Sequence, residues 1–120
     1  KAHWETTLGV RQFWASDVHA DPAGTIDAVL RQLRRLNVER VYVSNDVDGT
    51  DPSEAPATGT PEAGGLSSAF VEETIAAVRR AFQLAGRDVF ELAPPLGNGD
   101  WATDEPTCRL GARYLEALLN

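Results

Sequence analysis

Residues 41–52 read VYVSNDVDGTDP, an apolar run that leads directly into three aspartates, with a glycine among them and a proline at the end. The β-branched and aromatic residues of this region predict a short buried strand over residues 38–44. Asp46 and Asp48 are two residues apart, so an extended backbone would direct both carboxylates to the same side. Two anions placed together need a cation, or the protonation of one of them. The alternative without chemistry is a turn, since Asp, Gly and Pro are turn formers.

Helical patterns lie on both sides of this strand. Apolar residues at helical spacing predict one helix from Asp21-Pro22 to Leu36 and another from Val71 to Ala85, with Gly86 as its stop. A third helix is predicted over residues 107–119, with four residues facing inward: Leu110, Tyr114, Leu115 and Leu118. Residues 88–92 predict a second strand, and residues 8–20 predict one or two short strands.

The order of strands and helices predicts right-handed crossovers and a parallel sheet, hence an α/β fold. Ligands collect at the carboxyl ends of the strands in such sheets, and Asp46, Asp48 and Glu91 fall there. Residues 46–66 are rich in glycine and proline and predict a long irregular loop. A loop of this length inside a compact domain is usually functional or disordered.

Composition narrows the class of protein. A chain of 120 residues is one domain's worth, and its 11 basic against 18 acidic residues argue against a nucleic-acid partner. Cys108 is the single cysteine, and no apolar run of about 20 residues is present. We therefore expect a soluble cytoplasmic protein with no membrane partner. The sequence begins at Lys1 and contains no methionine, so a fragment or processed chain is as plausible as simple removal of an initiator.

The string DVDGT resembles the nucleophile motif of haloacid-dehalogenase-like phosphatases, in which Asp46 would attack phosphorus and Asp48 would move the proton. Residues 99–104, GDWATD, resemble the acidic magnesium motif of that family. The mechanism also needs a basic residue to hold the phosphoryl group. The only lysine is Lys1, upstream of the nucleophile, so Arg79 or Arg80 would have to take that role.

Residues 44–66, SNDVDGTDPSEAPATGTPEAGGL, resemble the signature of the ureohydrolase family, the arginases and agmatinases. The matching positions are Ser44, Asp46, Asp48, Asp51-Pro52, Pro56, the TGTP of residues 58–61 and Gly64-Gly65. Downstream, residues 88–97, DVFELAPPLG, resemble the next strand of that family and place Glu91 at its glutamate. The resemblance covers residues 38–119 well and 8–37 loosely. It implies that residues 1–120 are the C-terminal part of a ureohydrolase domain with a three-layer αβα fold around a parallel sheet.

The resemblance also implies a chemistry. Family members use a pair of manganese ions to hydrolyse a guanidino or amidine substrate, of arginine or agmatine type, to urea and an amine. Asp46 would bridge both Mn²⁺ ions and Asp48 would hold one, since hard carboxylate oxygens favour Mn or Mg. Glu91 would bind the planar cation of the substrate, Thr60 would help to shape the pocket, and the complete enzyme would be a homo-oligomer.

Two departures from the family pattern stand beside these matches. The histidine and aspartate motifs that complete the metal site, GGDHS-like and DAHxD-like, are absent, and His19 in DVHAD is wrongly spaced to replace them. Asn45 stands where the family has an apolar residue. The chain thus carries one side of a binuclear site, and we expect it to be inactive alone. A non-catalytic remnant of the fold remains a further alternative.

Overall fold

The computed structural model describes residues 2–97 and 105–120, which divide into two compact units, residues 1–38 and 39–120. Within those described ranges, no helix has both the length and the apolar character needed to cross a membrane.

The first unit contains three helices, α1 (Ala2–Thr7), α2 (Ala15–Ala20) and α3 (Pro22–Arg35). The start of α3 follows from its sequence, because the Asp21 carboxylate accepts a hydrogen bond from the Gly24 amide at 2.9 Å and Pro22 needs no amide partner in a first turn. Its buried face includes Thr25 and Ile26. This helix confirms the prediction for the region after Asp21-Pro22.

The prediction of strands over residues 8–20 is wrong. Residues 15–20 form α2, whose start is fixed when the Asp17 carboxylate accepts the Trp14 amide at 3.0 Å. Only Val18 of this helix is buried. A helix of six residues is too short to display an apolar period, so its sequence gives no helical signal.

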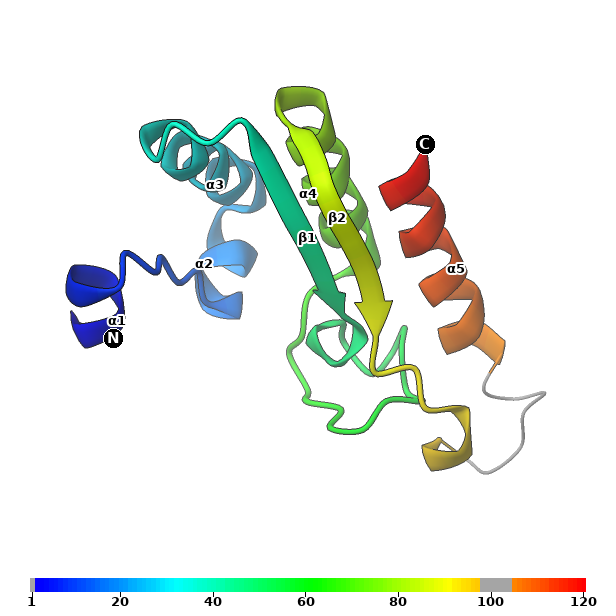
Figure 1. Ribbon diagram of the computed structural model, residues 1–120. Helices are drawn as coiled ribbons and strands as arrows, with labels where there is room; N and C mark the ends of the chain where they lie inside the picture. Colours follow the sequence, from blue (N-terminus) through cyan, green and yellow to red (C-terminus); the bar gives the residue numbers. More distant parts are fainter. Residues whose placement is uncertain (1, 98–104) are drawn as a thin grey trace. The chain divides into compact units, whose positions relative to one another are not determined.

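The second unit is built on two parallel strands, β1 (Arg40–Asp46) and β2 (Gln83–Phe90). The crossover between them contains the 3-10 turn η1 (Val47–Gly49), a long loop and helix α4 (Ser68–Ala81). After β2 come the 3-10 turn η2 (Pro94–Leu96) and helix α5 (Glu105–Leu119). Figure 1 shows α4 and α5 running along the strands, with the loop and η2 gathered at the arrowheads. The α/β class with a parallel sheet is confirmed.

The core of this unit lies between the strands and the two helices. Seven buried residues form it: Val47, Ala55, Val71, Ile75, Leu110, Tyr114 and Leu118. Three of the four α5 residues predicted to face inward are therefore confirmed, whereas Leu115 is 45% exposed. The buried positions 110, 114 and 118 recur every fourth residue and form one face of the helix. Position 115 lies one residue further along the helix and points away from that face.

The predicted end of the second helix is wrong. Helix α4 ends at Ala81, Phe82 is already extended, and residues 83–90 belong to β2, so Gly86 lies inside a strand and stops no helix. The Tyr42 ring lies directly over Gly86, where an added Cβ would be 2.5 Å from a ring atom. The tyrosine from β1 thus explains why a glycine occupies the middle of β2.

Candidate metal and substrate site

Asp46 ends β1, and Asp48 lies in the 3-10 turn that follows it. The expectation that both aspartates share one extended segment is therefore wrong. The turn instead brings the Asp48 amide to the Asp46 carboxylate, which accepts its hydrogen at 3.0 Å. Asp46 is exposed and Asp48 is half-buried, so the two carboxylates meet different surroundings.

The Asp48 carboxylate is held by the TGTP segment of the loop. Its Oδ2 atom accepts hydrogen bonds from the Thr60 amide at 2.9 Å and from the Thr60 hydroxyl. The Thr60 hydroxyl is the largest cause of a lowered Asp48 pKa, with smaller contributions from the Thr58 hydroxyl and the amides of Gly59 and Thr60, while burial opposes the shift. Asp48 is therefore ionised at neutral pH.

The other oxygen of this carboxylate, Oδ1, is buried and has no hydrogen-bond partner among the described residues, and the same holds for the Thr58 hydroxyl oxygen. Thr58 thus lies close enough to favour the Asp48 anion without completing a well-formed hydrogen bond to it. A buried carboxylate oxygen without a donor is unfavourable unless a cation or another donor reaches it. This orphaned oxygen is the feature that best fits a metal ion.

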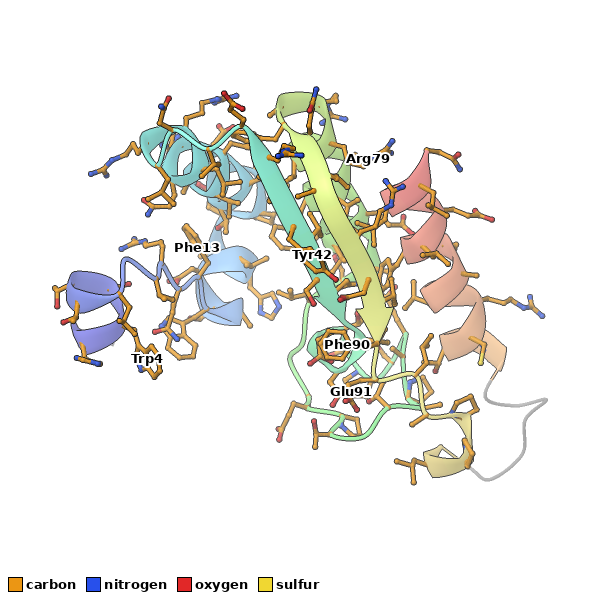
Figure 2. The ribbon with its side chains drawn as sticks, in the orientation of Figure 1. Trp4, Phe13, Tyr42, Arg79, Phe90 and Glu91 are labelled. Atoms are coloured by element: carbon orange, nitrogen blue, oxygen red, sulfur yellow. The ribbon has the colours of Figure 1, made fainter. Side chains whose placement is uncertain are left out.

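Glu91 follows β2 directly, and Figure 2 shows it beyond Phe90 at the carboxyl end of that strand. Its backbone has φ +65°, in the left-handed region that residues other than glycine rarely adopt. The residue itself is exposed. Strained backbone of this kind persists where the surroundings fix it, and it occurs often at functional sites.

Gly59 lies close to the carboxylates of both Asp48 and Glu91. A Cβ added to it would be 3.1 Å from Glu91 Oε2 and 3.8 Å from Asp48 Oδ2. The structure therefore brings together Asp48, Thr60 and Glu91, which the sequence had selected separately. The small size of Gly59 allows this approach.

The loop that carries the TGTP segment is closed at its neck. Thr50 and Leu66 form an isolated parallel bridge, and the Asp51 amide donates to the Leu66 carbonyl at 2.9 Å. The Asp51 carboxylate accepts from the Ser53 amide and hydroxyl at 2.9 and 2.6 Å and from the Gly64 amide at 3.0 Å. The Asp51 carboxylate thus closes the loop on itself.

A metal site can be tested against these residues. Asp46 and Asp48 supply hard carboxylate oxygens suited to Mn²⁺ or Mg²⁺. Among residues 2–97 and 105–120, however, no group of three or more His, Cys, Asp or Glu side chains could hold an ion. Asp46 and Asp48 are thus suited to act as two ligands of such an ion, and the described residues do not complete the set.

The other predicted candidates lie elsewhere or are already engaged. Arg79 donates to the Ala117 carbonyl at 2.8 Å and ties α4 to α5, so it does not serve as a free phosphate-binding group. His19 is an exposed residue at the end of α2. The acidic string of residues 99–104 lies outside the described residues. The Asn45 amide nitrogen is buried without a partner in the described part of the chain, yet the pairing of Asn45 with Val89 is regular.

The sequence did not predict how three residues support the site. Thr58 and Gly59 belong to the matched TGTP string, but nothing in that string indicates that Thr58 lies near Asp48 or that Gly59 lies close to both Asp48 and Glu91. Thr107, which binds the Ala57 amide at 3.1 Å, lies on the inner face of α5 three residues before Leu110. Helical spacing could have placed Thr107 inward, although it could not have supplied its partner.

Residues 39–120 thus form a parallel α/β unit in which carboxylates follow two neighbouring strands at their carboxyl ends. Residues 1–119 match the Arginase family, and the chain belongs to that family. It is 42% identical over 117 residues to a guanidinobutyrase and 41% identical over 95 residues to a guanidinopropionase, both from Pseudomonas aeruginosa. These matches cover 98% and 78% of this chain but 34% and 28% of the two relatives, about a third of their length.

Solved structures agree on the fold. The crystal structure of arginase from Bacillus subtilis superposes with a TM-score of 0.81 at 23% identity, over 98% of this chain and 39% of that one. The agmatine ureohydrolase of Thermoplasma volcanium superposes with a TM-score of 0.68 at 33% identity, over 88% of this chain and 32% of that one. The resemblance stated from the sequence is thus confirmed at the level of family and fold.

Proposed function

We propose that residues 1–120 serve in a manganese-dependent amidinohydrolase that converts a guanidino compound to urea and an amine. The observation that carries this proposal is the Asp48 carboxylate, in which one oxygen is held by Thr60 and the other is buried with no partner in the described part of the chain. A Cβ added to Gly59 would be close to both this carboxylate and that of Glu91, so the two groups lie near each other. A cation-binding carboxylate and a guanidinium-binding carboxylate are among the groups that such a reaction requires.

The roles of the chain's own residues follow. Asp46 and Asp48 would hold the metal, with Asp46 shared between two ions and Asp48 bound to one. Two divalent cations held there would lower the pKa of a water molecule enough to provide hydroxide at neutral pH, the nucleophile that a poorly electrophilic guanidinium carbon needs. Thr60 would fix the Asp48 carboxylate and border the pocket, and Glu91 would orient the planar cation of the substrate.

Relatives support the substrate class. Similar proteins include a guanidinopropionase, a guanidinobutyrase and an agmatinase, whose names share a guanidino group and differ in what it is attached to. We propose the same reacting group for this protein. The haloacid-dehalogenase alternative is not favoured, because the family match extends over residues 1–119 and the phosphatase motif over only a few of them.

The remaining proposals concern the complete protein. Since the described residues provide only part of a metal site, we propose that the other ligands lie outside residues 1–120, with this chain as the C-terminal part, and that the chain alone is inactive. We also propose a homo-oligomeric cytoplasmic enzyme.

The direct test is urea release by the full-length protein. Arginine, agmatine, guanidinobutyrate and guanidinopropionate are assayed with Mn²⁺, after chelation, and after Mn²⁺ is restored. We expect Mn²⁺-dependent release from at least one of them and none from residues 1–120 alone. Phosphate release from a phosphomonoester, without urea release from any guanidino compound, would overturn the proposal in favour of the phosphatase.

A further inference from the structure

Thr107 is a fully buried polar residue near the start of α5, and its exposed fraction is 0%. Its hydroxyl oxygen accepts a hydrogen bond from the Ala57 amide at 3.1 Å. The two residues are far apart in the sequence, so this bond ties the helix to the loop that follows β1. A buried polar contact between distant segments constrains both of them.

Ala57 is held on its other side as well. Its carbonyl accepts a hydrogen bond from the Ala93 amide at 3.0 Å, and the Ala57 side chain is 0% exposed. One residue of the loop is thereby fixed through its amide to α5 and through its carbonyl to the segment after β2. Little freedom remains for the backbone at this point.

Both halves of the proposed site lie next to this junction. The Thr58–Thr60 segment, which contacts Asp48, follows Ala57 directly. Glu91 stands two residues before Ala93, and a Cβ added to Gly59 would be 3.1 Å from Glu91 Oε2 and 3.8 Å from Asp48 Oδ2. The position of Ala57 therefore sets how the segment bound to Asp48 lies against Glu91.

We propose that Thr107 is a positioning residue for the active site, which acts through the Ala57 backbone to fix the Asp48-binding segment relative to Glu91. The proposal rests on the proposed function, because it assumes that Asp48 and Glu91 act on one substrate. Thr107 itself touches neither carboxylate. Sites of this kind lose efficiency when the supporting residues allow even about 1 Å of displacement.

The chemistry of the contact allows a sharp comparison of variants. Thr107→Val keeps the shape of the side chain and leaves the buried Ala57 amide without an acceptor. Thr107→Ser keeps the hydroxyl and removes only a methyl group. Thr107→Ala removes both the hydroxyl and the methyl group. It provides the same test if the valine variant does not fold.

The experiment uses the full-length protein loaded with Mn²⁺ and measures kcat, KM, Tm and hydrogen exchange at the amides of Ala57 and Thr60. We expect Thr107→Val to lower kcat/KM for the guanidino substrate about tenfold to a hundredfold. Exchange at both amides should accelerate in this variant. Thr107→Ser should restore kcat/KM and protection close to the wild-type values.

Two results would overturn the proposal. One is unchanged protection of Ala57 and Thr60 in Thr107→Val. The other is a lower Tm with unchanged kcat/KM, which would make Thr107 a stabilising residue only. If the wild-type protein released no urea, the proposed function would fail, and the positioning role of Thr107 would fail with it. The hydrogen-exchange result would then show only whether Thr107 orders the loop.

Discussion

The hydroxyl oxygens of Thr50 and Tyr114 lie 2.9 Å apart in the core of residues 39–120, where the two side chains are 1% and 0% exposed. Thr50 stands at the neck of the loop that carries the proposed site, and Tyr114 is in the middle of α5. Burial is the largest cause of the raised Tyr114 pKa, which keeps the phenol protonated at neutral pH. This buried polar bond joins the neck of the loop to the helix.

Tyr114→Phe should reduce the free energy of unfolding by about 1–3 kcal/mol, because the Thr50 hydroxyl would remain buried without a partner. Urea denaturation of the full-length protein measures the change. The double variant Thr50→Val/Tyr114→Phe removes both partners and should recover much of the loss. A double variant whose loss is the sum of the two single losses would show that the pair has no coupling.

Asp46→Asn should lower both the manganese content and the urea release of the full-length protein, since a carboxamide is a weaker ligand than a carboxylate and bridges two cations poorly. Metal analysis after dialysis and a urea assay test this. Asp27→Asn makes the same chemical change at an exposed position of α3 and should alter neither. Full manganese content in Asp46→Asn would contradict the ligand role.

Glu91→Gln should keep the metal and the fold but lower kcat/KM. The loss should correspond to about 2–5 kcal/mol of transition-state stabilisation, which is typical for removal of a charged hydrogen-bond pair. Arg113 pairs with Glu72 at 2.7 Å and is therefore engaged with a carboxylate other than Glu91. Urea release, metal content and Tm are measured together, with Glu116→Gln on α5 as the matched control. Near-normal urea release would remove Glu91 from the site.

Gly59→Ala should displace the Glu91 carboxylate, because the new Cβ would come within 3.1 Å of its Oε2 atom. We expect kcat/KM to fall about tenfold. The Tm should change little, since the atom that must move is the end of a side chain. Gly49→Ala is the control, as a Cβ there meets no atom within 4 Å. Equal kinetics in the two variants would show that the closeness of Gly59 to Glu91 has no catalytic consequence.

The Asp88 carboxylate predicts a pH dependence. It accepts hydrogen bonds from the hydroxyls of Ser44 and Tyr42, both at 2.7 Å, and these two bonds, that of Ser44 first, lower its pKa. These bonds therefore stabilise the folded state fully at pH values above the unfolded-state pKa of Asp88, about 3.9. Their contribution disappears as the pH falls through the lower pKa that Asp88 has in the folded state. Ser44→Ala should thus be less stable than wild type near neutral pH.

The difference between Ser44→Ala and wild type should narrow as the pH falls below that range, which urea denaturation at a series of pH values can follow. Ser16→Ala, at an exposed position of α2, controls for the loss of a serine hydroxyl. A difference that stays constant with pH would mean that the Ser44 contact does not depend on the charge of Asp88.

Local patterns made much of the fold predictable. The Asp21 cap, the following proline and the apolar spacing were sufficient to predict α3, and the β-branched run before Asp46 was sufficient to predict β1, within two residues at each end. The start of β2 was not predictable, because the residues after Ala81 continue a helical pattern of apolar residues. What places them in a strand is pairing with β1 and the Tyr42 ring over Gly86.

The same division holds for the site. Asp46, Asp48 and Thr60 could be proposed because they fall in one contiguous motif, residues 44–66, and Glu91 because it falls in a second one, residues 88–97. The left-handed backbone of Glu91, the orphaned oxygen of Asp48 and the bond from Thr107 to Ala57 depend on how distant segments meet. No periodicity in the sequence reports such contacts.

The parallel pairing of Asp46 with Phe90 has a consequence for how this region acquires function. Glu91 can come close to Asp48 only after the crossover segment with α4 has folded and the two strands have paired as far as Asp46 and Phe90. Pairing between segments so distant along the chain is a slow, late event in folding. In the proposed enzyme, binding of metal and substrate would therefore occur only in the completely folded protein. A chain in which the strands had not yet paired would contain all of these residues but would lack the assembled site.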